Sequence, residues 1–328
     1  MSIRPVVVVL HDGRAPRAEA LAPVAAHAEI RYCDESQLAG SLVGAQVLFV
    51  HHFLSNAVPG AWHAADSLQW LHIAAAGVDP VMFPEIRASE VVVTNSRGIF
   101  DVAIAEYVLA QMLSFAKDLP GSWHRQRSHT WQHTDSQRLA GSTALVVGTG
   151  PIGRAIARLL GAVGVEVRGT GRRARTGDPD FTAVAAAEDL ATELARADWV
   201  IAAAPLTDLT RHLFDADAFA AMRPGARFIN VGRGELVRTP DLLEALRNGT
   251  IAGAALDVLD PEPLPREHPL WEAPNVVITA HRSGDVLGWR EELVALFALN
   301  FQRWITGATL MNVVDKNLGY VPSEGAAP

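Results

Sequence analysis

The sequence predicts an α/β fold with two doubly wound parallel-sheet domains and a cleft between them. Three observations support this class. Short apolar runs alternate with helical patterns along the chain, 328 residues suffice for about two domains, and one glycine-rich turn joins a strand pattern to a helix pattern. Apolar residues make up 49% of the chain and charged residues 20%, so it can bury hydrophobic cores of ordinary size.

Charge and cysteine content narrow the class of protein further. The formal net charge of −8 disfavours a general nucleic-acid binder or a protein that binds acidic membranes. The one cysteine, Cys33, lies in a polar stretch and excludes an internal disulfide, so we expect a bystander thiol and a reducing, cytoplasmic location. The apolar run 5–10 is too short to cross a bilayer, and we expect it to form the first strand.

The first 95 residues predict a parallel sheet covered by helices. Strand patterns and wholly or partly helical patterns alternate, with strands expected at 6–10, 47–50, 70–73 and 91–94 and helices at 15–27, 37–44 and 62–66. Ligands of open α/β sheets bind beyond the carboxyl ends of strands, so the loops 51–53 and 74–80 are candidates to face a substrate.

Two long helices and a polar segment flank the second sheet. Apolar residues at helical spacing predict helices over 100–116 and 286–304. The segment 117–139 is long for a simple connection, and we expect an arm that packs on something. Its histidines, at positions 124, 129 and 133, have no acidic or cysteine cluster beside them, so no metal site is predicted.

The region from 143 to 279 predicts a dinucleotide-binding domain. Six strand patterns alternate with helix patterns, and a Gly-x-Gly-x-x-Gly sequence follows the first strand. The strands are expected at 144–147, 165–168, 199–203, 227–231, 254–258 and 276–279, and the helices at 154–162, 188–196, 217–222 and 240–247.

The glycines of this sequence have separate expected roles. Gly148 allows a tight turn, Gly150 lets a pyrophosphate approach the backbone, and Gly153 lets the helix pack on the strand. The amides of the first helical turn would then face the phosphates. A glycine-rich turn without a ligand is the alternative, but the strand before it and the helix after it favour nucleotide binding.

The end of the second strand of this domain indicates which nicotinamide cofactor binds. No carboxylate stands there to accept a hydrogen bond from the ribose 2′-hydroxyl of NAD. Arg172 and Arg173 follow instead, and guanidinium groups bind phosphate well. We therefore expect NADP to be preferred over NAD, with these two arginines as ligands of the 2′-phosphate; a solvated basic turn is the alternative.

Three reactive side chains follow later strands of the same sheet. Arg233 lies between two glycines that would let a ligand approach, Glu262 lies in a proline-rich loop, and His281 follows the last strand. Reduction of a ketone needs a proton donor, which histidine provides at neutral pH and a neighbouring carboxylate supports. An arginine can bind a substrate carboxylate and polarise the carbonyl, so these three residues suit a carbonyl reductase.

These residues together resemble the D-isomer-specific 2-hydroxyacid dehydrogenase family. The resemblance covers nearly the whole chain and rests on the ordered segments 76–79, 95–98, 148–153, 204–210, 230–235, 256–270 and His281. It implies a discontinuous substrate domain, residues 1–96 and 287–328, and an NAD(P)-binding domain of the Rossmann type, residues 97–286, each similar to Rossmann or flavodoxin folds. It also implies a homodimer, which suits the tryptophan-bearing arm.

The resemblance implies specific roles for residues of this chain. His281 would be the general acid/base, Glu262 its partner and Arg233 the substrate anchor, while the amides of Ala76 and Gly77 would bind the substrate carboxylate. Asp257 would accept a hydrogen bond from the nicotinamide carboxamide. The implied cofactor-binding residues are Gly148, Gly150, Pro151, Ile152, Gly153, Arg172, Arg173, Pro205, Thr210, Val231 and Asp257.

The implied activity is the reduction of 2-keto acids to D-2-hydroxy acids with NADP(H). Two alternatives stay open: a reductase specific for glyoxylate and hydroxypyruvate, and a non-catalytic NAD(P)-sensing protein of the same fold. Ala280 stands where the family usually has proline, which implies a different local backbone. His51, His52 and Phe53 occupy the family's substrate loop, and a plain surface role is favoured over a role in substrate selectivity.

Overall fold

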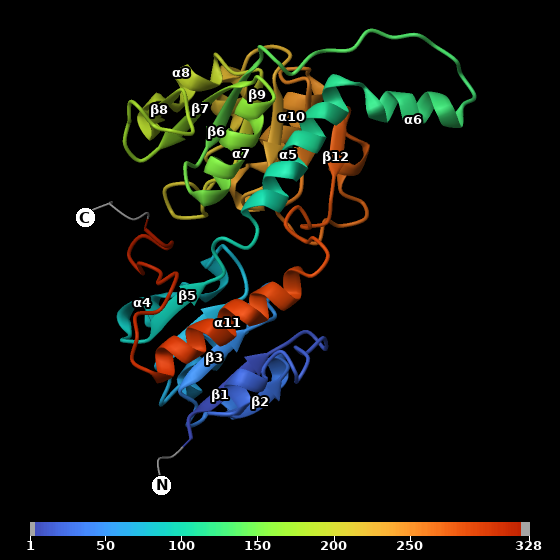
Figure 1. Ribbon diagram of the computed structural model, residues 1–328. Helices are drawn as coiled ribbons and strands as arrows, with labels where there is room; N and C mark the ends of the chain where they lie inside the picture. The colour runs from blue at the N-terminus through green and yellow to red at the C-terminus, as the bar shows by residue number, and fades with distance from the viewer. Residues whose placement is uncertain (1–3, 323–328) are drawn as a thin grey trace. The chain divides into compact units, whose positions relative to one another are not determined.

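The computed structural model describes residues 4–322, which fold into two compact units (Figure 1). Unit 1 comprises Met1–Ile99 and Val286–Pro328, and unit 2 comprises Phe100–Asp285. Each unit contains one parallel sheet with helices packed against it, which confirms the predicted pair of parallel-sheet α/β domains. Within residues 4–322, no helix is long and apolar enough to cross a membrane.

The sheet of unit 1 has five parallel strands in the order β2-β1-β3-β4-β5. This is the doubly wound order found in flavodoxin-like folds. The strands are β1 Val6–Leu10, β2 Glu29–Cys33, β3 Val47–Val50, β4 Trp70–Ile73 and β5 Val92–Asn95. The helices are α1 Ala22–Ala25, α2 Leu38–Leu42, α3 Val58–Ala61, α4 Pro84–Ala88 and α11 Trp289–Ile305.

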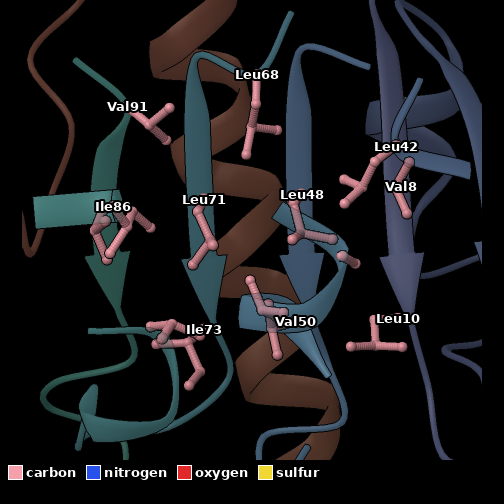
Figure 2. Close-up of a cluster of buried hydrophobic side chains, with 14 of the residues drawn as sticks. Val8, Leu10, Leu42, Leu48, Val50, Leu68, Leu71, Ile73, Ile86 and Val91 are labelled. Carbon is pink, nitrogen blue, oxygen red and sulfur yellow. The ribbon is translucent and has the colours of Figure 1, made fainter. Parts of the chain in front are cut away.

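Both faces of this sheet are buried. Alternate side chains of β1, β3 and β4, including Leu10, Leu48 and Ile73, pack against α2, α3 and α4 in one cluster (Figure 2). On the opposite face, the Phe49 ring stacks on Phe297 of α11 at a centroid distance of 4.1 Å, and Trp70 stacks on the same ring at 5.2 Å. Burial on two faces explains why these strands are continuous apolar runs.

Three features of unit 1 differ from the predictions. Strand β2 was not predicted, because of its five residues only Cys33, at the carboxyl end, is fully buried, so no apolar run marks it. Cys33 is therefore a core residue, 1% exposed, and not a thiol in polar surroundings. The helix expected over 15–27 is reduced to α1, because Pro16 and Pro23 interrupt the pattern.

The sheet of unit 2 has seven parallel strands in the order β12-β11-β10-β9-β6-β7-β8. The strand order reverses between β6 and β9, which is the position where doubly wound sheets bind dinucleotides. The strands are β6 Thr143–Val147, β7 Glu166–Gly171, β8 Ala183–Ala186, β9 Trp199–Ala202, β10 Arg227–Asn230, β11 Gly253–Leu256 and β12 Val276–Ile278.

The helices of unit 2 include one that the sequence did not suggest. The predicted polar arm contains α6, Leu119–Arg127, which continues from α5, Asp101–Ala116, and extends away from the sheet (Figure 1). Strand β8 was also missed, because an alanine-rich edge strand has no strong apolar pattern. The remaining helices are α7 Pro151–Ala162, α8 Leu190–Leu194, α9 Ala216–Ala221 and α10 Thr239–Arg247.

Candidate active site

The glycine-rich loop between β6 and α7 has the geometry that its sequence predicts. Gly148 has a φ of +110°, and a Cβ atom there would lie 2.6 Å from the Ala203 carbonyl oxygen. A Cβ atom on Gly153 would lie 2.0 Å from the Gly148 carbonyl oxygen. Only glycine fits these two positions, because any side chain would collide with backbone.

The middle glycine of the loop leaves space for a ligand. A Cβ atom on Gly150 would meet nothing within 4 Å. This residue is the N-cap of α7, with Pro151 and Ile152 in the first turn. The amides at the start of this helix and its dipole favour a bound phosphate, so the loop fits the pyrophosphate of a dinucleotide.

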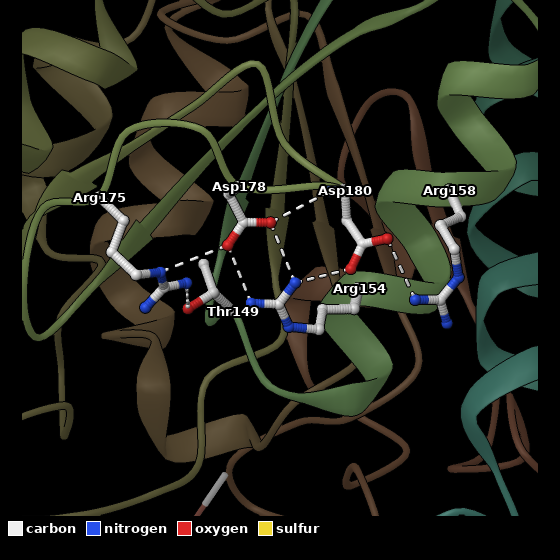
Figure 3. Close-up of polar contacts among 6 residues, drawn as sticks. All are labelled: Thr149, Arg154, Arg158, Arg175, Asp178 and Asp180. Atoms are coloured by element: carbon white, nitrogen blue, oxygen red, sulfur yellow. Dashed lines mark hydrogen bonds and ion pairs between the residues drawn. The ribbon is translucent and has the colours of Figure 1, made fainter. Parts of the chain in front are cut away.

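Charged side chains beyond β7 form a cluster beside the glycine loop (Figure 3). The Arg154 guanidinium donates to both carboxylate oxygens of Asp178, at 2.9 and 3.0 Å, and to Asp180. Arg175 donates to Asp178 and, at 3.0 Å, to the hydroxyl of Thr149 in the loop itself. The segment after β7 is thus attached to both the loop and α7.

This cluster was missed in the sequence, although Arg175 lies in the same basic run as Arg172 and Arg173. Burial disfavours the ionised form of Asp178, but hydrogen bonds from Arg154 and the Asp180 amide outweigh this and lower its pKa to about 2. The carboxylates of Asp178 and Asp180 are therefore both engaged in ion pairs with arginine side chains. Arg172 and Arg173 are exposed directly after β7, at the edge where the glycine loop lies.

His281 and Glu262 lie together at the carboxyl edge of the same sheet. His281 Nδ1 is 2.7 Å from Glu262 Oε1, and the two side chains are 25% and 33% exposed, so the pair is accessible to a substrate. The second carboxylate oxygen of Glu262 accepts from the Leu259 amide at 3.4 Å. Because Nδ1 is directed at the carboxylate, Nε2 is the ring nitrogen available for proton transfer.

Asp257 supports the turn that carries His281. Its carboxylate is 1% exposed and accepts from the backbone amides of Arg282, at 3.0 Å, and Ser283, at 2.9 Å. The hydroxyl of Thr279 donates to the same carboxylate. Three donors from within the protein thus hold this group, and its expected contact with a nicotinamide carboxamide stays a prediction.

Arg233 follows β10 in a turn held by a buried asparagine. The Asn230 side chain donates to the Arg233 carbonyl oxygen at 2.9 Å and accepts from the Gly232 amide at 3.1 Å. The packing of the turn itself requires the flanking glycines, and ligand access beside them stays a prediction. A Cβ atom on Gly234 would lie 1.9 Å from the Leu259 carbonyl oxygen, and one on Gly232 would lie 2.7 Å from the Leu236 side chain.

The other expected cofactor residues lie beyond β9 and β10. The Thr210 hydroxyl donates to the Pro205 carbonyl oxygen at 2.6 Å and accepts from the Thr207 amide at 2.8 Å, so it holds the turn after β9. Val231 is 7% exposed, and its amide donates to Ala202. Among residues 4–322, no group of three or more histidine, cysteine, aspartate or glutamate side chains is placed to hold a metal ion.

Unit 1 holds the remaining residues that the sequence singled out. Ala76 and Gly77 follow β4 and are partly exposed, and the Asn95 side chain fixes this loop by donating to the Ala76 carbonyl oxygen. His51 does not have the surface position that was favoured for it. It is 2% exposed, and neither ring nitrogen has a hydrogen-bond partner among the described residues.

The comparison with protein-family models decides the family. The model for the D-isomer specific 2-hydroxyacid dehydrogenase, NAD binding domain, matches residues 109–283. The chain belongs to this family. A curated relative, the human glyoxylate reductase/hydroxypyruvate reductase, is 33% identical over 252 residues, which cover 74% of this chain and 76% of the relative. The predicted family is confirmed, and with it an NAD(P)-binding oxidoreductase fold.

Solved structures of the family resemble the chain over nearly its whole length. A D-isomer specific 2-hydroxyacid dehydrogenase family protein from Aeromonas salmonicida is 32% identical with a TM-score of 0.82, covering 96% of this chain and 100% of the other. The NADPH-dependent glyoxylate/hydroxypyruvate reductase from Sinorhizobium meliloti, solved with NADP and sulfate, is 28% identical with a TM-score of 0.83, covering 97% and 100%.

Proposed function

We propose that the protein reduces 2-keto acids to D-2-hydroxy acids with NADPH. The 2.7 Å contact between His281 and Glu262, at the same sheet edge as the glycine loop, carries this proposal. An imidazole that is accessible and paired with a carboxylate can donate a proton to a substrate oxygen and recover it afterwards. A protein that only sensed NAD(P) would have no use for such a pair.

The roles of this chain's residues follow from their chemistry. The nicotinamide supplies the hydride to the carbonyl carbon when the cofactor is bound. Arg233 binds the substrate carboxylate and polarises the carbonyl. His281 Nε2 donates its proton to the oxygen that becomes the hydroxyl. Glu262 stabilises the imidazolium before the transfer and keeps the ring oriented.

The charges near the adenosine end favour NADP over NAD. A carboxylate beyond β7 would be needed to accept from the 2′-hydroxyl of NAD, but Asp178 is occupied by Arg154 and Arg175. Arg172 and Arg173 add positive charge that suits a 2′-phosphate. The S. meliloti relative, which was solved with NADP, is consistent with this preference.

Glyoxylate and hydroxypyruvate are the first substrates to test, because both the human and the S. meliloti relatives are reductases of these names. The purified protein would be mixed with NADPH or NADH and a series of 2-keto acids of increasing side-chain size, and nicotinamide absorbance followed. We expect turnover with NADPH at a higher kcat/KM than with NADH. NADPH binding without turnover of any keto acid would contradict the proposal and favour the sensor.

The arm favours a homodimer. Trp123 on α6 is 58% exposed and Trp131 after it is fully exposed, and exposed aromatic side chains of this size are typical of protein interfaces. Light scattering of the purified protein tests this, and a monomer at micromolar concentration would contradict it. A cytoplasmic location is proposed with it, since the single cysteine is buried and forms no disulfide.

A further inference from the structure

A tyrosine on α5 reaches the turn that carries His281, although the proposed chemistry gives it no role. The Tyr107 hydroxyl is 2.8 Å from the Thr279 hydroxyl. Thr279 Oγ1 is in turn 2.5 Å from Asp257 Oδ1. The three side chains are joined by consecutive hydrogen bonds, from Tyr107 on α5 to Thr279 after β12 and then to Asp257 after β11. All three residues belong to unit 2.

The direction of each hydrogen bond in this chain is determined by chemistry. An ionised carboxylate only accepts, so the single hydroxyl proton of Thr279 goes to Asp257. Thr279 can then only accept from Tyr107, which must donate. Burial raises the pKa of Tyr107 to about 12, which keeps its phenol protonated at all pH values at which the protein would work. Tyr107 therefore donates to the Thr279 oxygen, while the Thr279 proton is directed at Asp257.

Asp257, the last residue of this row of hydrogen bonds, supports a turn with an uncommon backbone conformation. His281 has a φ of +48°, in the left-handed region that non-glycine residues adopt only rarely. Its amide donates to the Asp257 carbonyl oxygen at 2.8 Å, and the next two amides donate to the Asp257 carboxylate. These three hydrogen bonds hold the backbone of the turn from which the His281 side chain extends, while Glu262 holds the ring itself.

We propose that Tyr107 and Thr279 are positioning residues for His281. They act through Asp257, since neither touches the imidazole, and the inference rests on the proposed function because it assigns His281 the proton transfer. Without the Tyr107 donor the Thr279 oxygen loses the contact that holds it from the side opposite Asp257, and without the Thr279 donor the buried carboxylate loses one of its three partners. In both cases the turn gains freedom and the imidazole is less often aligned with the substrate oxygen.

Four variants test this proposal. Tyr107→Phe and Thr279→Val each remove one hydroxyl and keep the shape of the side chain, while Thr279→Ser keeps the hydroxyl. We expect kcat for keto acid reduction to fall about 10-fold in the first two, as is reasonable for a small misalignment. Thr279→Ser should retain the wild-type kcat. The double variant Tyr107→Phe/Thr279→Val should be no slower than Thr279→Val, because Tyr107 acts through Thr279.

Tyr32→Phe is the matched control, because Tyr32 is an exposed tyrosine on β2 of unit 1. An unchanged kcat in both Tyr107→Phe and Thr279→Val would overturn the proposal. So would a kcat for Thr279→Ser as low as that for Thr279→Val, or losses that multiply in the double variant. A low kcat in Thr279→Ser or multiplying losses in the double variant would indicate a general loss of packing. The expected pattern instead indicates positioning through consecutive hydrogen bonds.

Hydrogen exchange of the wild type and variants gives a measurement independent of turnover. The amides of residues 281–283 should exchange faster in Tyr107→Phe and Thr279→Val than in the wild type and Tyr32→Phe, with the glycine loop unchanged. If no keto acid is reduced but these amides still respond, the proposed function fails and the hydrogen-bonded support of the turn stands. Unchanged exchange in an active enzyme would contradict the positioning role alone.

Discussion

The two sheets have the same parallel architecture, but the histidines near the carboxyl ends of their strands have different surroundings. In unit 1, burial lowers the pKa of His72 to about 3, and burial together with the charge of Arg290 lowers that of His51 to about 4. In unit 2, His281 is partly exposed and contacts a carboxylate. Burial disfavours the charged imidazole that a proton donor needs, so the proposed proton transfer is assigned to His281 and not to His51 or His72.

Burial of the ring disfavours the charged form of His72. The Trp70 indole donates to the Thr94 hydroxyl, and the oxygen of this hydroxyl is 2.7 Å from His72 Nδ1. His72 Nε2 faces the Ser96 hydroxyl at 3.3 Å. Both ring nitrogens thus contact neutral hydroxyl groups and no carboxylate, so a charged imidazole in this buried site would destabilise unit 1.

The largest expected effect comes from removing the imidazole of unit 2. His281→Ala should lower kcat by about 10²–10⁴-fold, the range for a lost general acid, while NADPH still binds with its normal affinity. Steady-state kinetics and fluorescence titration measure the two quantities. His63→Ala, which changes an exposed histidine of unit 1, is the control. Unchanged turnover in His281→Ala would refute the catalytic assignment.

A smaller and selective effect is expected from the arginines beyond β7. Arg172→Ala combined with Arg173→Ala should weaken NADPH binding by about 10- to 100-fold, because two charge-assisted contacts to the 2′-phosphate are lost. NADH binding should change little. The pair Arg17→Ala with Arg247→Ala removes the same charge at exposed positions elsewhere and is the matched control. Equal weakening of both cofactors would contradict the role in 2′-phosphate binding.

The third expected effect concerns acid stability and comes from unit 1. Because folding lowers the pKa of His72 below the unfolded value of 6.5, stability is present above pH 6.5 and is lost as the pH falls toward about 3. Between pH 7 and pH 5 we expect His72 to account for a loss of about 2 kcal/mol in the free energy of unfolding. Urea unfolding of wild type, His72→Asn and the exposed-site control His133→Asn measures it. An equal loss in His72→Asn would exclude His72 as the cause.

Much of the fold could be predicted because its strands carry strong local patterns. β1, β3, β4, β6 and β9 are short apolar runs, and burial on two faces requires such runs. The edge strands β2 and β8 could not be predicted in this way, because polar residues and alanines leave no apolar pattern. The helix α6 was missed for a related reason, since none of its residues is buried.

The strand ends of unit 2 could be assigned from sequence, but the contacts between side chains could not. His281 and Glu262 follow different strands, and their proximity was inferred because parallel strands end at one edge. The Tyr107–Thr279–Asp257 chain joins residues far apart in the sequence, and no spacing rule relates them. The glycines beside Arg233 have a role that the local pattern did not reveal, since Gly234 packs closely against the backbone at Leu259.

The burial of Cys33 has a practical consequence for spectroscopy. It is the one cysteine of the sequence, it is 1% exposed, and burial raises the pKa of its thiol, so it reacts slowly with thiol reagents. A cysteine introduced at an exposed position, for example by Trp131→Cys in the arm, would be labelled selectively without removing the native residue. A fluorophore or spin label there would report on the arm in the otherwise unmodified protein.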